Sequence, residues 1–413
     1  MYRPLSLLPH FMLHSVNNLG ANIYLFGPIL CMFLRTYQSF LLFNVFCGLA
    51  RDKTQMIVLR FFSGMAGVAP VAIGPGIVAD LFEPEERGSA MAIYTLSPIL
   101  GPCIGPIYAG WIIQAYGEDK WPWIFYVSTM FGALVAVLGL IFLRETYIPV
   151  ILEREASKVR KERGEDEWHT VFTNKEPLRT RIIQGLFRPF IFLATQPVVL
   201  VTCIYQGLMF GCQYLLLASF SRLFKDNYGQ SPGLAGLHYF SMVIGFLISG
   251  IIGGKWVDWK YRRLKERNGG IGKPEFKLPF LVVTGIAMPV GLLLYGWTAE
   301  YHLHWMAPDA GIFILSWGLC ATMFICPLYL ADAVTIYAAS ASSAGIITRG
   351  LFAFTFPLFA PNMYEELGQG WGNSLLALAT LLIGIPAPIL LYRFGETLRN
   401  HSSYSKHAMS LIS

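Results

Sequence analysis

Residues 121–143 read WPWIFYVSTMFGALVAVLGLIFL, an apolar run without a single charged side chain. A helix crosses the hydrocarbon core of a bilayer with about 20 apolar residues, so this run is long enough to span a membrane. Apolar residues fill both faces of the run instead of alternating along it, and this pattern favours a helix over a strand. The segment therefore predicts a transmembrane helix.

The rest of the chain has the same character. Of its 413 residues, 54% are hydrophobic and 14% are charged, whereas soluble proteins carry about 25% charged residues. This composition excludes an ordinary soluble enzyme, a disordered scaffold and a disulfide-stapled secreted module. Further spans are predicted at 56–80, 90–115, 190–220, 235–254, 278–297, 308–331, 346–366 and 371–392, with two short or irregular helices at 24–34 and 39–50, on either side of Arg35. We expect an all-α polytopic membrane protein with about 11 transmembrane helices.

The charged residues predict the domain boundaries and the topology. A charged linker at 144–189 separates an N-terminal bundle, 1–143, from a C-terminal bundle, 190–395, and a tail follows at 396–413. Lys and Arg concentrate in the linker, in the tail and in a predicted loop at 255–277, which places all three in the cytoplasm. Aromatic residues are interspersed among the Lys and Arg residues of that loop, a mixture that can also occur in nucleic-acid-binding segments. Contact with anionic lipid explains this composition better than binding of nucleic acid does. A plasma-membrane location is expected.

Catalytic and cofactor signals are missing from the sequence. All seven cysteines lie in apolar stretches, where a free thiol behaves as a small hydrophobe. No spacing suits a metal cluster or a disulfide framework, and no phosphate-binding loop or nucleophile–base pair occurs. We therefore expect no cofactor, no metal site and no enzymatic activity.

Residues 97–110, SPILGPCIGPIYAG, form the most specific local motif. Its Gly-Pro pairs recur at a spacing of four, which places them on one helix face. Proline removes a backbone donor and kinks a helix, while glycine lets a neighbouring helix approach closely. The motif residues are Gly101, Pro102, Gly105, Pro106 and Gly110.

This motif resembles the Gly-Pro signature in the fifth span of the drug:proton antiporters of the major facilitator superfamily, particularly the fungal members. Further similarities follow in the family's order: LRFFSG at 59–64, GKWVD at 254–258, PEFKLP at 274–279, and a Tyr-Asp-Ala-Ser-Ala-Arg pattern between 329 and 349. The resemblance implies two pseudo-symmetric helical bundles and a binding site near the middle of the bilayer. It also implies proton-coupled efflux of a lipophilic drug, toxin or secondary metabolite by a monomer.

The family's first-half loop motif has no counterpart near residues 27–40, where it is expected, and the family's usual first span has no counterpart either. We therefore expect a chain that is shortened at its N-terminus relative to the twelve-span family pattern. Two alternatives stay open within the same fold. One is facilitated uptake or polyamine transport, and the other is a transport-dead, sensor-like remnant.

Ionisable residues inside the predicted spans or close to their ends are candidates for proton coupling or gating, because burying a charge in a membrane is costly. Arg60, about one turn inside the outer end of its span, could instead be an anchor that reaches the headgroups. Asp80 and Asp332 lie near cytoplasmic helix ends, where a salt bridge between the inward loops is the simpler explanation. Arg349 is the expected partner for one of these acids. The candidates are Arg60, Asp80, Asp258, Asp332 and Arg349.

Spans 190–220 and 308–331 are rich in aromatic rings with polar tips and in amides. Such side chains suit bulky, apolar or amphipathic solutes, although helix packing is the alternative role for each. The candidate substrate-binding residues are Tyr205, Gln206, Gln213, Tyr214, Trp317 and Tyr329. None of these residues is acidic, so the set gives no support to a strongly cationic substrate such as a polyamine.

Overall fold

The computed structural model describes residues 28–68, 78, 82–142, 157, 178–334 and 338–400. In this part of the chain every regular element is a helix. Seven helical segments are long and apolar enough to cross a membrane. The predicted all-α polytopic membrane architecture is thereby confirmed.

The first bundle contains four described helices, which are α2 (Pro28–Leu49), α3 (Lys53–Gly67), α5 (Arg87–Tyr116) and α6 (Pro122–Phe142). α2 is one continuous helix, so the prediction of two short helices separated at Arg35 is wrong for this region. A single arginine does not interrupt a helix, because arginine is a good helix former and leaves the backbone hydrogen bonds intact.

The second bundle begins with α9 (Pro197–Tyr228). A nearly continuous helical segment follows, which consists of α10 (Pro232–Leu237), α11 (Tyr239–Ile248), the π-helical turn η3 (Ser249–Gly253) and α12 (Gly254–Arg267). After the short turn η4 (Pro274–Lys277) come α13 (Pro279–Glu300), α14 (Met306–Val334), α15 (Ala338–Gly384) and α16 (Pro386–Asn400). α15 bends at Gly368 (φ 71°, ψ 179°), which divides it into the two spans expected on either side of this residue.

Two element boundaries differ from the sequence prediction. The predicted span at 190–220 is two helices, because α8 (Leu178–Thr195) ends before Pro197 and α9 starts there. The residue before a proline is pushed out of the α-helical region, and Gln196 is extended accordingly. The segment expected to be a loop from residue 255 is helical as far as Arg267. The charged residues that follow residue 254 therefore do not end the helix.

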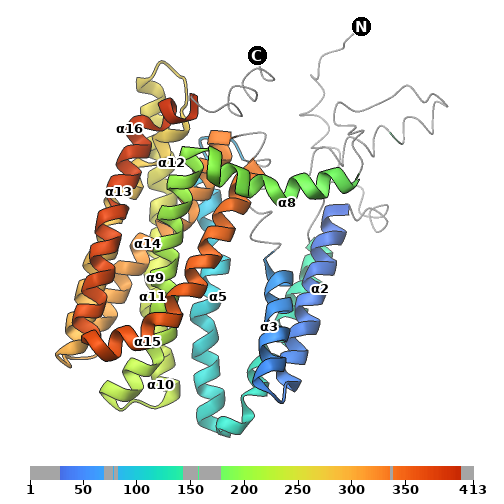
Figure 1. Cartoon of the computed structure of the whole chain (residues 1–413), viewed down its shortest axis with the longest axis vertical. Coiled ribbons are helices and arrows are strands. Elements are labelled where there is room, and N and C mark those ends of the chain that lie inside the picture. Colours follow the sequence, from blue (N-terminus) through green and yellow to red (C-terminus); the bar gives the residue numbers. More distant parts are fainter. Residues whose placement is uncertain are drawn as a thin grey trace.

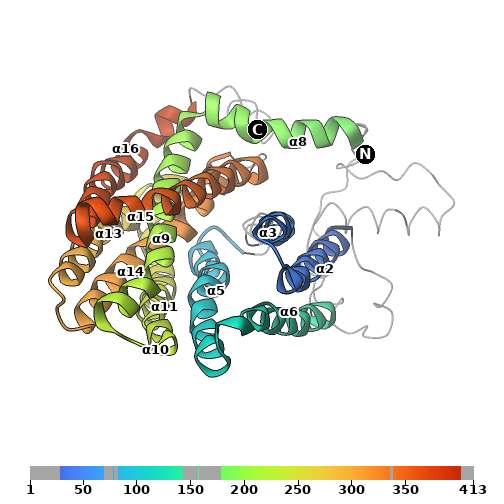
Figure 2. The same ribbon diagram turned by 60° about the horizontal axis from the view of Figure 1, so that its bottom comes forward.

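α5 joins the two bundles. It packs on α10, α11, α12 and α14 of the second bundle, whereas α2 packs on α3 and α6. In Figure 2, α5 lies between the α2, α3 and α6 group and the second bundle. Figure 1 shows α8 lying across the end of the molecule near α12. We call this end, which carries Lys260, Arg262, Arg263, Lys265 and Arg267 of α12, the basic end.

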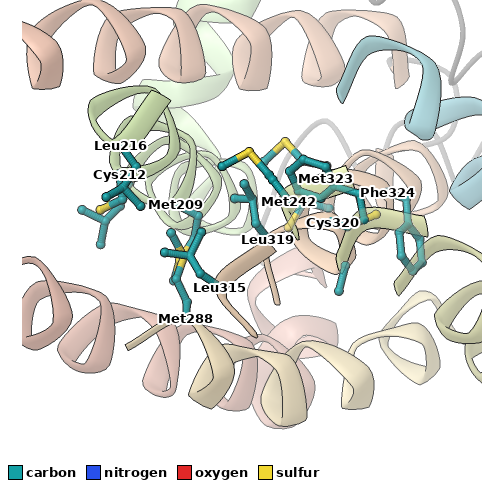
Figure 3. Close-up of a cluster of buried hydrophobic side chains, with 14 of the residues drawn as sticks. Met209, Cys212, Leu216, Met242, Met288, Leu315, Leu319, Cys320, Met323 and Phe324 are labelled. Atoms are coloured by element: carbon teal, nitrogen blue, oxygen red, sulfur yellow. The ribbon is translucent and has the colours of Figure 1, made fainter. Parts of the chain in front are cut away.

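The core of the second bundle is rich in sulfur. Side chains including Met209, Met242, Met288 and Cys320 gather between α9, α11, α13 and α14 (Figure 3). Six described cysteines are free and buried, as predicted. Methionine is flexible and polarisable, so such a core can tolerate small shifts between helices.

Candidate functional site

A cavity of about 410 Å³ lies between the two bundles and is lined by residues of both. α3 and α5 contribute one side, and α9, α14 and α15 contribute the other; the arrangement of these helices can be followed in Figure 2. Its volume is in the range of small-molecule sites, which run from about 300 to 1,000 Å³. Its side chains are mainly apolar, with Phe40, Met91, Phe210, Met323 and Leu330 among them.

Arg60 lines this cavity from α3. The helix begins at Lys53, so Arg60 lies about two turns from its first residue. Its guanidinium carbon is 4.6 Å from the centroid of the Phe125 ring, a cation–π arrangement. The side chain is exposed on the described surface.

Arg349 lines the same cavity from α15. Its guanidinium carbon is 5.4 Å from the centroid of the Phe210 ring, and its Nη1 donates to the sulfur of Met323 at 3.6 Å. Its Nε is buried without a hydrogen-bond partner. No carboxylate of the described residues pairs with Arg349, so the expected pairing with an acid of the inward loops is not found there.

Two of the six candidate substrate-binding residues reach the cavity. Gln206 and Tyr214 line it together with Phe210, and the spacing of four places all three on one face of α9. The Gln206 side chain is buried, and its Nε2 has no hydrogen-bond partner among the described atoms.

The other four candidates lie elsewhere in the second bundle. The Tyr205 hydroxyl is 3.1 Å from the hydroxyl of Thr322, and Trp317 packs edge-on against Phe280. Gln213 and Tyr329 are buried and do not line the cavity. The composition of α9 and α14 does not distinguish the faces of a helix that is buried on nearly every side.

Sequence reasoning did not identify several polar residues that line the cavity. Tyr94 and Thr95 reach it from α5, and Ser63 and Ser342 reach it from α3 and α15. Their position in the sequence could have indicated them. Tyr94 and Thr95 lie about one helical turn before Pro98, which belongs to the SPILGPCIGPIYAG motif and also lines the cavity.

Asp332 connects the two bundles at the basic end. Its Oδ1 is 2.8 Å from Nη1 of Arg87 in the first bundle, and its Oδ2 is 2.6 Å from Nζ of Lys277 in the second. The Lys277 side chain is fully buried, and the Asp332 side chain is 13% exposed. One carboxylate thus pairs with two cations, and sequence reasoning had identified neither of them as its partner.

Asp258 caps the start of α5 from the opposite bundle. Its carboxylate accepts hydrogen bonds from the backbone N–H groups of Gly88, at 2.8 Å, and Ser89, at 2.9 Å, and a short one from the Ser89 hydroxyl. A negative charge at a helix N-terminus satisfies free N–H groups and interacts favourably with the helix dipole. This cap therefore holds α12 against α5.

Two surface ion pairs add to the contact at the basic end. Lys265 forms a short ion pair with Glu85, and the hydrogen bond from Lys265 lowers the pKa of this carboxyl. Arg262 and Glu86 are 3.8 Å apart and more than half exposed, so their contribution is small. Asp80, the remaining ionisable candidate, lies outside the described residues.

The Gly-Pro motif lies on α5, which continues as one helix through Pro98, Pro102 and Pro106. A Cβ at Gly110 would lie 2.4 Å from the carbonyl oxygen of Pro232, so α10 approaches the backbone of α5 closely there. A Cβ at Gly101 or Gly105 would meet no heavy atom within 4 Å. Close helix packing thus explains Gly110 but not the other two glycines.

Among the described residues, no group of three or more His, Cys, Asp or Glu side chains is placed to hold a metal ion. The chemistry that the cavity offers is therefore that of its arginines, hydroxyls, amide and aromatic rings.

Comparison with known proteins agrees with this architecture. The sequence profile of the Major Facilitator Superfamily matches residues 23–357. The chain is 38% identical to the efflux pump radE of Floropilus chiversii, over 88% of this chain and 67% of that protein. It is 39% identical to the efflux pump vrtL of Penicillium aethiopicum, over 89% of this chain and 72% of that protein.

A solved structure of the proton:xylose symporter XylE superposes with a TM-score of 0.62 at 14% identity, covering 90% of this chain and 82% of that one. At this identity the likeness concerns the fold. Together with the family profile and the sequence relatives, it supports the helical fold described above. The chain belongs to the major facilitator superfamily and is a multi-pass membrane transporter, not an enzyme.

Proposed function

We propose that the protein exports a lipophilic drug, toxin or secondary metabolite in exchange for protons, by alternating access. The observation that carries this proposal is a cavity lined by both bundles, together with ionic contacts that join the bundles at the basic end. A site shared by two bundles can be opened to either side if the bundles rock about it.

The positive-inside rule supports an orientation in which the basic end, the linker and the C-terminus face the cytoplasm. In that orientation the contacts of Asp332 and Asp258 close the cytoplasmic side of the cavity. We further propose a plasma-membrane location and a monomer surrounded by lipid. Among the relatives, radE and vrtL are named efflux pumps, which supports the outward direction.

Asp332 is the group that we propose as the gate at the basic end. Its carboxylate binds both Arg87 and Lys277. Only the Arg87 contact crosses between bundles, so loss of this contact favours separation at the basic end. Arg60 supplies a fixed positive charge beside the cavity.

Accumulation of a hydrophobic dye in inside-out vesicles tests the function. We expect accumulation when the vesicle interior is acidic and little accumulation after a protonophore collapses the gradient. Arg60→Ala should abolish this accumulation, and Arg60→Lys should retain part of it. Equal dye content with and without the gradient would overturn the antiport mechanism.

The same assay separates the alternatives. Facilitated uptake would equilibrate the dye without a gradient. A polyamine transporter would require acidic cavity side chains, and the described lining contains none. A sensor-like remnant would bind solutes in the cavity but would transport nothing under either condition.

A further inference from the structure

The described residues that line the cavity carry charge of one sign only. Arg60 and Arg349 face the cavity from opposite bundles, and no Asp or Glu occurs among its described lining residues. The remaining polar groups include the hydroxyls of Tyr94 and Tyr214 and the amide of Gln206, all of which can donate a hydrogen bond.

Arg349 lacks a suitable acceptor within the described protein. Its Nε is buried without a partner, and its Nη1 has only the thioether of Met323, which is a weak acceptor. A buried guanidinium carries a large desolvation cost unless it is paired and hydrogen-bonded. The Phe210 ring offsets a part of this cost through a cation–π contact. Donors aimed at a cavity without a counter-charge indicate that the counter-charge comes from a ligand.

We propose that the cavity takes organic anions with an aromatic body, and that Arg349 binds their carboxylate, sulfonate or phenolate group. A planar guanidinium presents donors in a fork that matches such oxygens. Phe40, Phe210 and Met323 supply the apolar surface for the body of the ligand. This substrate class rests on the proposed function, because the same cavity is taken to be the transport site.

A matched pair of fluorescent probes tests the proposal in equilibrium binding. Anilinonaphthalene sulfonate carries an anionic group, and phenylnaphthylamine has the same ring system without it. The purified full-length protein is placed in phosphatidylcholine nanodiscs, and the signal of empty discs is subtracted. No proton gradient is present, so a failure of proton-coupled export leaves this measurement unaffected.

For Arg349→Gln we expect the affinity for the sulfonate to fall about tenfold or more, because a hydrogen bond to a charged group is lost. Arg349→Lys should keep only part of the sulfonate affinity, because an ammonium keeps the charge but not the fork of donors. Binding of the neutral probe should stay unchanged in both variants, which also shows that the cavity is folded. Arg222→Gln, in an exposed ion pair within α9, is the control and should change neither probe.

Three outcomes would overturn the proposal. The first is an equal loss of affinity for both probes in Arg349→Gln, and the second is an unchanged affinity for both. The third arises when phosphatidylglycerol is added to the discs. If this lipid weakens sulfonate binding to the native protein but not to Arg349→Gln, a lipid headgroup is the anion at this site.

Discussion

Arg87→Gln should weaken closure of the basic end without unfolding either bundle. The Arg87 Nη1 and the Asp332 Oδ1 are 2.8 Å apart, and the two side chains are 21% and 13% exposed. A hydrogen bond between charged groups is worth about 1.5–3 kcal/mol, and the partial exposure favours the lower value. A loss of about 1.5 kcal/mol shifts the equilibrium between the closed and open basic end about tenfold. Asp332 keeps Lys277 as a partner in this variant.

Distance measurements between spin labels report this shift. Labels at Glu83→Cys and Glu266→Cys lie on exposed positions of the first and second bundle. We expect Arg87→Gln to increase the fraction of molecules with the longer distance. Arg222→Gln, which breaks a pair within one helix, should leave the distribution unchanged. The inter-bundle role of Arg87 is refuted if its variant gives the native distribution at every pH tested.

Asp332→Asn should lower the free energy of unfolding by about 3–5 kcal/mol, because the fully buried Lys277 loses its counter-charge. Adding Lys277→Met should restore most of this loss. No recovery in the double variant would contradict this account. Gly110→Ala should destabilise by about 1–3 kcal/mol through a clash with the backbone of α10, whereas Gly101→Ala should be neutral; equal melting temperatures would show that the contact can relax. Burial raises the pKa of the Glu275 carboxyl above its usual value of 4.5. The contribution of this carboxyl to the free energy of unfolding is therefore fully present below pH 4.5 and is lost as the pH rises through the raised pKa. Glu275→Gln should therefore raise the melting temperature more at about pH 7 than at about pH 4, and an equal change at both would count against the explanation.

Most of the fold could be predicted from the sequence because membrane helices are encoded by continuous apolar runs. The run at 121–143 corresponds to α6, and the Gly-Pro run lies in α5. The predictions were wrong where the ends of an apolar run do not coincide with the ends of a helix. α12 continues through charged residues, and α8 separates from α9 at a proline.

The candidate site was predictable only in part. Arg60, Arg349, Gln206 and Tyr214 were identified because polar groups are rare in apolar helices, and all four line the cavity. The pairing at the basic end was not predictable in detail. Arg87 and Asp332 are 245 positions apart, and the packing of two bundles decides which cation meets which acid.

Alternating access is tested most directly by linking the bundles at the basic end. Glu85 and Lys265 are in contact across the bundles, and the six described native cysteines that could compete are buried. In Glu85→Cys/Lys265→Cys, a short cleavable thiol cross-linker should abolish gradient-driven dye accumulation, and cleavage should restore it. A matched pair within α9, Arg222→Cys/Asp226→Cys, should transport normally when linked. Undiminished accumulation with the inter-bundle link fully formed would contradict the account.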